Sequence, residues 1–501
     1  MQFVATKSLD YIRNYESMNL LKYNGLYIYY DHSFEKYEDS KKIILLSGVI
    51  FNKDINEVTT DFNDLEFGPI LIYIDKISDD IYFLNDKFKV VTIIYDVVRS
   101  VITNNWMFLN SNTYYFNGDS VNSILYNPRL HAIKYNKMIV SPVKVYSFDI
   151  THNNDIDYDS HTNLIEETIQ NNIDKILKRY KKPLFMCSPR GVDSNLIAQC
   201  IEKNRTKVQT YTRWGNKLDY KYLSFYQNIT DSPTIKYIND YTPEINSNKN
   251  WSLNGRHAWH YFLDDFPDNL DYDCILLGTN GDNALPHTAE MAFSVDYYDD
   301  KEKRLVEVLK KLDISKGLTP FHSRIISEWA KKYRDKYFFN DKGILGFVGY
   351  LQKKFNLIDC MFFIENIGYI QELGLQKNKP IITPFYDTRL YQILLKTKKE
   401  HLNYILNSEI LTRNVLKERF DLVDEHRNQT EGLFETDIYY ISNDFKDKLF
   451  QVYVEMSDIS SKRTKEKLVG LYHNIADRDS FELLLKHNFK VEYEKNSIRT
   501  S

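Results

Sequence analysis

The sequence predicts an α/β protein with two regions. The N-terminal region, residues 1–155, is expected to form an antiparallel β-sandwich, and the C-terminal region, residues 160–501, a parallel sheet with helices, mainly helical towards its end. Short β-rich runs separated by polar turns fill the N-terminal region, which is typical of antiparallel sheets. Strands alternate with helical segments in the C-terminal region, and this favours a parallel sheet because the crossover helices cover its faces.

The strands of the N-terminal region are recognised by runs of aliphatic and aromatic residues. The turns Asn-Lys-Asp after residue 51 and Ser-Asp-Asp after residue 77 are examples of the polar segments that separate them. The predicted strands are residues 25–30, 43–51, 69–74, 90–95 and 139–148. A polar stretch, residues 153–160, follows them and marks the predicted boundary between the two regions.

The C-terminal region begins with apolar residues at helical spacing, which predict a helix over residues 164–180. A buried strand is expected next, followed by a turn and a second helix. The remaining segments predict two more strands, and helical patterns dominate from about residue 305. The predicted strands are residues 183–187, 207–214 and 274–278, the turn is 188–194 and the second helix is 195–203.

The composition excludes several classes of protein. The chain is 43% hydrophobic and 27% charged, which is ordinary for a folded soluble protein and excludes disordered and collagen-like chains. Its net charge of −4 provides no general positive field, so we expect neither a nucleic-acid partner nor a membrane partner. Four scattered cysteines do not suit a disulfide framework or a zinc site. With no signal-peptide pattern and no long apolar stretch, the sequence predicts a cytoplasmic location.

Two loops that follow predicted strands carry the residues best suited to chemistry. The turn Ser-Pro-Arg-Gly-Val-Asp-Ser, residues 188–194, places backbone N–H groups before a helix, an arrangement suited to phosphate. Asp193 in this turn requires a divalent cation beside a phosphate, and Asp282 in the loop 278–283 supplies a second carboxylate. The sequence therefore predicts that these two residues hold Mg²⁺ against a bound triphosphate. The alternative is that Asp193 and Ser194 only cap the helix.

These motifs resemble those of the asparagine synthetase family, whose pyrophosphate loop reads Ser-Gly-Gly-x-Asp-Ser and whose later motifs read Ser-Gly-x-Gly-x-Asp-Glu and Pro-Phe-Leu-Asp. The resemblance implies a glutaminase-like, Ntn-type domain over residues 1–155. It also implies an adenine-nucleotide α-hydrolase-like synthetase domain over residues 160–501, with ATP and Mg²⁺ as cofactors. The stretches that carry it, in the family's order, are 67–75 with 82–88, 184–195, 277–283 and 381–390.

Several positions depart from the family's pattern. Gln2 stands where the family's glutaminase has its nucleophilic cysteine, and no cysteine precedes Cys187, so we expect no release of ammonia and disfavour an asparagine synthetase proper. This loss resembles the β-lactam synthetases, carbapenam synthetases and lasso-peptide cyclases, which adenylate a carboxylate for attack by an amine. Pro189 and Arg190 replace Ser and Gly in the phosphate loop, which removes an N–H group and adds a Cβ.

A stretch near the C-terminus, residues 427–434, resembles the Arg-x-x-Thr-Lys-Gly segment of the cyclase-like members. Arg427 keeps the arginine of that segment, whereas Glu431 replaces the lysine that stabilises developing negative charge in amide formation. We name both residues as candidate catalytic positions. The carboxylate of Glu431 has the wrong sign for the role of that lysine.

The sequence thus predicts a divergent ATP-dependent amide-bond-forming ligase without glutaminase activity, which adenylates a small-molecule or peptide carboxylate and releases AMP and pyrophosphate. The sequence leaves open whether the protein forms a homodimer or binds a biosynthetic partner protein. The alternative is a catalytically degenerate, asparagine synthetase-like pseudoenzyme that acts as a binding or scaffold protein. The expected nucleotide-binding residues are Arg190, Gly191, Val192, Asp193, Ser194, Arg213 and Gly278, and the expected metal ligands are Asp193 and Asp282.

Overall fold

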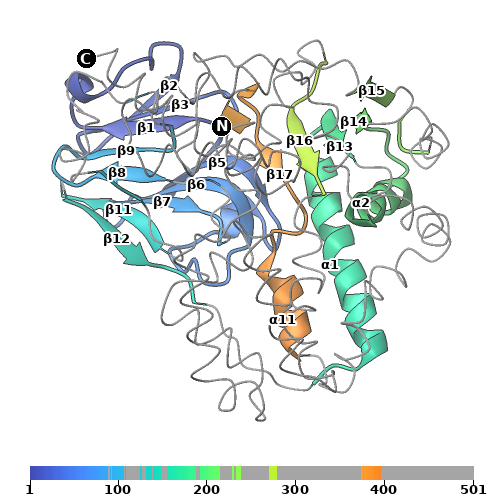
Figure 1. Ribbon diagram of the computed structural model, residues 1–501. Coiled ribbons are helices and arrows are strands. Elements are labelled where there is room, and N and C mark those ends of the chain that lie inside the picture. The colour runs from blue at the N-terminus through green and yellow to red at the C-terminus, as the bar shows by residue number, and fades with distance from the viewer. Residues whose placement is uncertain are drawn as a thin grey trace, which may run out of the picture.

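The structure is a computed structural model, and it contains three sheets within the residues that it describes (Figure 1). Two of the sheets are six-stranded and antiparallel, and the third is five-stranded and parallel. The described residues are 1–87, 91, 93–105, 108, 124–126, 131–137, 139–147, 155–187, 192–214, 228–230, 233–237, 270–278, 374–375 and 377–396.

The two antiparallel sheets belong to the N-terminal region. The first has the order β10 (Ile124–Tyr126), β8 (Ile94–Asp96), β9 (Val101–Thr103), β1 (Phe3–Thr6), β3 (Leu26–Tyr30) and β2 (Asn19–Tyr23). The second has the order β12 (Ile139–Lys144), β11 (His131–Asn136), β7 (Asp80–Asn85), β6 (Phe67–Asp75), β5 (Lys42–Ile50) and β4 (Glu35–Glu38). Short 3-10 helices, η1 (Leu9–Tyr11) and η2 (Ile55–Glu57), lie in two of the connections.

The two sheets share one apolar core. Phe3 of β1 stacks on Phe83 of β7 with their ring centroids 5.6 Å apart. Strand β5 is buried along its whole length. Ile43 and Leu45 face the core between the sheets, whereas Ile44 and Leu46 face a second apolar cluster on the other side. A strand that is buried on both faces favours apolar residues at consecutive positions, which explains the aliphatic run of residues 43–46 within β5.

The parallel sheet belongs to the C-terminal region, and all its neighbouring strands are parallel. Its order is β15 (Pro233–Tyr237), β14 (Gln209–Trp214), β13 (Pro183–Met186), β16 (Cys274–Leu277) and β17 (Ile381–Ile382). The described helices of this region are α1 (Tyr158–Arg179), α2 (Val192–Lys203) and α11 (Thr388–Lys396), and α1 packs against both of the others. Within the described residues, no helix combines the length and the apolar character that crossing a bilayer requires.

The order of the parallel strands reverses at β13. The chain proceeds from β13 to β14 and β15 on one side, and then returns to place β16 and β17 on the other side. In open parallel sheets, ligands bind beyond the carboxyl ends of the strands at such a reversal, because the connections leave in opposite directions and open a crevice there. The point between β13 and β16 is therefore the position from which to build a candidate site.

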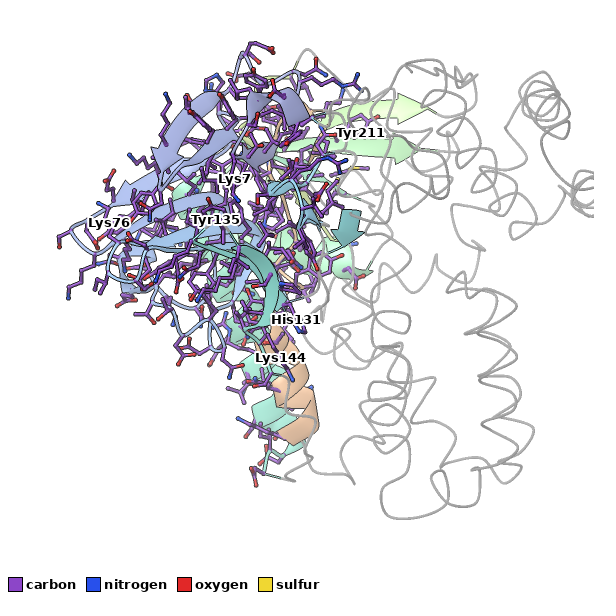
Figure 2. All side chains as sticks on the ribbon, turned by 90° about the vertical axis from the view of Figure 1, so that its left-hand side faces the viewer. Lys7, Lys76, His131, Tyr135, Lys144 and Tyr211 are labelled. Carbon is purple, nitrogen blue, oxygen red and sulfur yellow. The ribbon has the colours of Figure 1, made fainter. Side chains whose placement is uncertain are left out.

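The two regions contact each other extensively. Strand β17, at the edge of the parallel sheet, lies beside β5 and β6 (Figure 1), and a single cluster of buried apolar side chains includes residues of both regions. The Tyr180 hydroxyl, just after α1, donates a hydrogen bond of 3.1 Å to the carbonyl of Gly48 in β5. Tyr135 of β11 and Tyr211 of β14, both 1% exposed, mark the interiors of the two regions (Figure 2).

Most of the predicted elements are confirmed within a few residues. Helix α1 begins six residues before the predicted position, since the Asp157 side chain accepts a hydrogen bond from the Ser160 N–H and caps the helix there. Helix α2 likewise begins at Val192 rather than at residue 195. Of the predicted strand 90–95, the structure shows only β8, and residues 88–90 and 92 lie outside the described residues. The helical pattern from residue 305 lies largely outside them, and the domain boundary stays a prediction.

The first turn of α1 contains a buried titratable group, so we expect the stability of the folded protein to depend on pH. His161 is fully buried, and burial lowers its pKa from 6.5 to about 4. His161 therefore binds a proton at a higher pH in the unfolded chain than in the folded protein. We expect the free energy of unfolding to fall by up to about 3 kcal/mol as the pH drops from 6.5 to 4. Urea unfolding across this range should show a shallower pH dependence for His161→Gln than for the wild type. The exposed His32, changed to Gln, is the control.

Candidate functional site

The candidate site is built on the carboxyl edge of the parallel sheet, where β13 and β16 end side by side. Met186 is the last residue of β13 and pairs with Leu277, the last residue of β16. After β13 the chain enters α2, whose first turn contains Asp193 and Ser194. After β16 comes Gly278. The two loops that the sequence selects therefore leave the sheet from neighbouring strands.

The structure brings Ser194 and Gly278 into contact. A Cβ placed on Gly278 would lie 3.2 Å from both the backbone nitrogen and the Oγ of Ser194, and 3.4 Å from its Cα. These distances are shorter than a comfortable carbon contact, so the close approach of the two segments favours a residue without a side chain at position 278. Ser194 is buried and Asp193 is partly exposed. The contact lies where the strand order reverses.

Helix α2 is oriented by its apolar residues. Leu196, Ile197 and Ile201 are fully buried in the cluster that also contains Leu184 and Phe185 of β13. This packing holds the helix against the sheet and leaves its N-terminus at the carboxyl edge. The first N–H groups of a helix have no partner within the helix, and its dipole is positive at this end. Both features favour an anion at this position.

Arg213 lies near the end of β14, on the other side of β13. Tyr211 pairs with Met186, the last residue of β13, so Arg213 is two residues beyond the end of that strand. The backbone position is the one expected for a residue at the carboxyl edge. The side chain of Arg213 lies outside the described residues.

The stretch 381–390 contributes a buried carboxylate that is fully engaged by the protein. Asp387 follows β17, is 0% exposed, and accepts hydrogen bonds from Asn172 Nδ2 at 2.9 Å and Arg389 Nε at 3.0 Å. Arg389 in turn donates a hydrogen bond of 2.9 Å to Asn172 Oδ1. This arrangement connects the segment after β17 to the middle of α1. Because its oxygens are occupied by protein donors, Asp387 serves the structure of this edge.

Two charged residues of the N-terminal region reach the same segment, and the sequence interpretation did not select them. Lys87 Nζ lies 2.5 Å from Glu66 Oε1, and Glu66 Oε2 accepts a 3.0 Å hydrogen bond from the backbone N–H of Thr388. Burial, together with the nearby charge of Asp387, raises the pKa of Glu66, and the ammonium of Lys87 opposes this effect. Glu66 and Lys87 flank two paired strands, and no local sequence signal distinguishes them from surface charges.

Gln2, at the position where the resemblance would place a nucleophilic cysteine, bridges the two regions. Its Nε2 donates hydrogen bonds to the Leu375 carbonyl at 2.8 Å and to Asn378 Oδ1 at 2.5 Å. Its Oε1 accepts a hydrogen bond of 3.0 Å from Asn105 Nδ2. An amide group is not a nucleophile of the kind that attacks a carboxamide, so the chemistry available at this position is hydrogen bonding.

The remaining predicted site residues are only partly covered by the description. Val192 begins α2, and its side chain is not among those described. Arg190 and Gly191, the second metal-ligand candidate Asp282, and the catalytic candidates Arg427 and Glu431 lie outside the described residues. Among the residues that are described, no three His, Cys, Asp or Glu side chains form a group able to hold a metal ion. The predicted pairing of Asp193 with Asp282 thus stays a prediction.

No family model matches the chain, and no curated protein matches its sequence. Any functional assignment therefore depends on the sequence motifs and on the geometry of the carboxyl edge.

Proposed function

We propose that the protein is a divergent ATP-dependent ligase of the asparagine synthetase type that forms an amide bond and has no glutaminase activity. The observation that carries this proposal is the contact between Ser194 and Gly278 at the reversal of the parallel strand order. The two loops selected by their phosphate-binding and metal-binding residues meet at the position where open parallel sheets bind nucleotides. The meeting follows from the parallel pairing of β13 with β16, which brings the loops after both strands to one point of the carboxyl edge.

Each residue of the edge has a defined role in the proposal. The first turn of α2, with Gly191 and Ser194, would bind the phosphates through N–H groups. Asp193 and Asp282 would hold Mg²⁺, which prefers carboxylate oxygens and supplies charge neutralisation for the phosphates. Arg190 and Arg213 would add guanidinium contacts to phosphate oxygens. Asp193 suits this role because it lies in the first turn of α2 and is partly exposed.

The proposed reaction consists of two displacements. A carboxylate oxygen of a small molecule or peptide attacks the α-phosphorus of ATP and pyrophosphate leaves. An amine nitrogen then attacks the activated carbonyl carbon, AMP leaves, and the amine loses a proton. The protein would contribute alignment of the reactants and neutralisation of negative charge. We propose a cytoplasmic location for this activity, where ATP is available.

A pseudoenzyme is the second candidate, and the bridging role of Gln2 favours it. The amide of Gln2 and the carboxylate of Asp387 are both engaged in bonds that hold the protein together. A chain that has lost chemistry at these positions would keep such contacts and act as a binding or scaffold protein.

Nucleotide binding tests the ligase before a substrate is known, and turnover then separates it from a pseudoenzyme that binds nucleotide. Calorimetric titration with MgATP, with ATP in EDTA as the metal-free control, is expected to show Mg²⁺-dependent binding. Incubation with amino acids and peptides that carry free carboxylates should then release AMP and pyrophosphate in equal amounts. Release of ADP and phosphate would contradict the ligase, and absence of MgATP binding at millimolar concentration would favour the pseudoenzyme.

A further inference from the structure

Glu66, Lys87 and Thr388 form a buried polar cluster between the N-terminal and C-terminal regions. Their exposed fractions are 4%, 9% and 2%. Glu66 Oε1 is bound by Lys87 Nζ and by the Thr388 hydroxyl, and Glu66 Oε2 is bound by the Thr388 N–H at 3.0 Å. Lys87 Nζ also lies 3.4 Å from the Thr388 hydroxyl. Both oxygens of the Glu66 carboxylate therefore accept hydrogen bonds, although Glu66 and Thr388 are 322 residues apart in the sequence.

The carboxylate of Glu66 acts as an N-terminal cap for α11. Thr388 is the first residue of this helix, and its N–H group has no acceptor within the helix. Asp387, the residue just before the helix, accepts the next N–H group, that of Arg389, at 2.9 Å. The acceptor for the Thr388 N–H comes in addition from Glu66, the residue that precedes β6 of the N-terminal region, and its negative charge suits the positive end of the helix.

The segment that is held in this way belongs to the candidate site. Residues 383–387 connect β17 to α11, and β17 pairs with β16 through Ile382 and Leu276. The segment therefore leaves the carboxyl edge beside Gly278. Its other attachment is Asp387, which is held by Asn172 of α1. The N-terminal region and α1 thus hold the segment from two sides.

We propose that Glu66 and Lys87 are positioning residues, through which the N-terminal region sets the place of segment 383–388 at the carboxyl edge. This inference rests on the proposed function, because it takes the carboxyl edge to be the MgATP site. It gives the N-terminal region a role that needs no nucleophilic cysteine, namely that of a fixed wall of the nucleotide site. Lys87 acts through Glu66, because it supplies the positive charge that a buried carboxylate requires.

A second ion pair between the two regions provides a matched control. Arg179, the last residue of α1, pairs with Glu35 of β4, and the Glu35 side chain is 55% exposed. Arg179 precedes β13, so this pair lies towards the opposite, amino edge of the parallel sheet. Glu35→Gln removes the same charge from the same interface without touching segment 383–388.

The test compares wild type, Glu66→Gln, Thr388→Val, Thr388→Ser and Glu35→Gln as full-length proteins. Hydrogen exchange of the amides in residues 383–390 is expected to accelerate about tenfold or more in Glu66→Gln and in Thr388→Val, and to stay unchanged in Glu35→Gln. Thr388→Ser keeps the hydroxyl donor and should restore slow exchange. MgATP affinity, measured where every variant is fully folded, should fall about tenfold in Glu66→Gln and stay at the wild-type value in Glu35→Gln.

The two readouts separate failure of this inference from failure of the proposed function. Unchanged exchange in both Glu66→Gln and Thr388→Val overturns the positioning role, whatever the nucleotide result. Accelerated exchange in a protein that never binds MgATP supports the attachment of the segment and refutes the proposed function. Unchanged MgATP affinity in Glu66→Gln, with wild-type binding intact, overturns the positioning role at the nucleotide site. If Glu66→Gln does not fold, Thr388→Val carries both readouts.

Discussion

Gly48→Ala is expected to destabilise the protein by about 3 kcal/mol or more, a large share of the roughly 5–15 kcal/mol that stabilises a typical domain. Gly48 has φ +130°, a conformation that residues with a Cβ rarely adopt, and an added Cβ would overlap the carbonyl group of Gly68 in the paired strand β6. The Gly48 carbonyl also accepts the hydrogen bond from Tyr180. The substitution would therefore disturb β5 and its contact with the C-terminal region together.

Equilibrium unfolding by urea measures this effect, and Gly25→Ala is the matched control. Gly25 also has a positive φ, +74°, but a Cβ there would meet nothing within 4 Å. At this turn the alanine would only have to adopt an unfavourable positive φ, so we expect the free energy of unfolding to fall by about 1 kcal/mol. Equal destabilisation by the two substitutions would show that the close approach of β5 and β6 at Gly48 is not what requires the glycine.

Asp193→Asn is expected to reduce the MgATP-dependent release of AMP by at least about 100-fold, the size of effect seen when one charge-stabilising group is removed from an active site. The change keeps the shape of the side chain, but it removes the negative charge that would hold Mg²⁺ beside the phosphates. The melting temperature should change little, because Asp193 is partly exposed.

Glu202→Gln is the control for this substitution, because it removes one carboxylate from the last turn of the same helix, α2. It should leave MgATP binding and AMP release at wild-type values. A second variant, Gly278→Val, would push against Ser194 and should weaken MgATP binding without any change of charge. Wild-type affinity in both Asp193→Asn and Gly278→Val would contradict a nucleotide site at this edge.

The local elements could be predicted from the sequence only in part. The sequence analysis did not predict several short strands, namely β1, β2, β4, β7, β9, β10, β11, β15 and β17. The aliphatic run of β5, the helical spacing in α1 and the buried strands β13 and β16 all have the pattern that their burial requires. The N-terminus of α1 was missed by six residues, because its cap at Asp157 lies in a polar stretch that resembles a linker. Side-chain pattern indicates burial well, whereas single capping contacts have weak sequence signals.

The candidate site could be predicted only in part. The sequence selected Ser194 and Gly278 as members of phosphate-binding and metal-binding loops, and the structure places them in contact. It did not select Glu66, Lys87 or Asn172, since a charged residue beside a strand or an amide on a helix looks the same whether it is exposed or buried. Their partners are distant in the chain, and only folding brings them together.

By itself, the sequence determined the approximate positions of the elements whose apolar residues follow a clear pattern, such as β5, β13, β16 and α1, because burial imposes a period of two or of 3.6 on apolar residues. Only the tertiary structure decided the order of the parallel strands and the reversal between β13 and β16. It also decided that a carboxylate of the N-terminal region caps α11. Strand order and contacts over hundreds of residues depend on which surfaces fit together once the elements exist, and that information is spread over the whole chain.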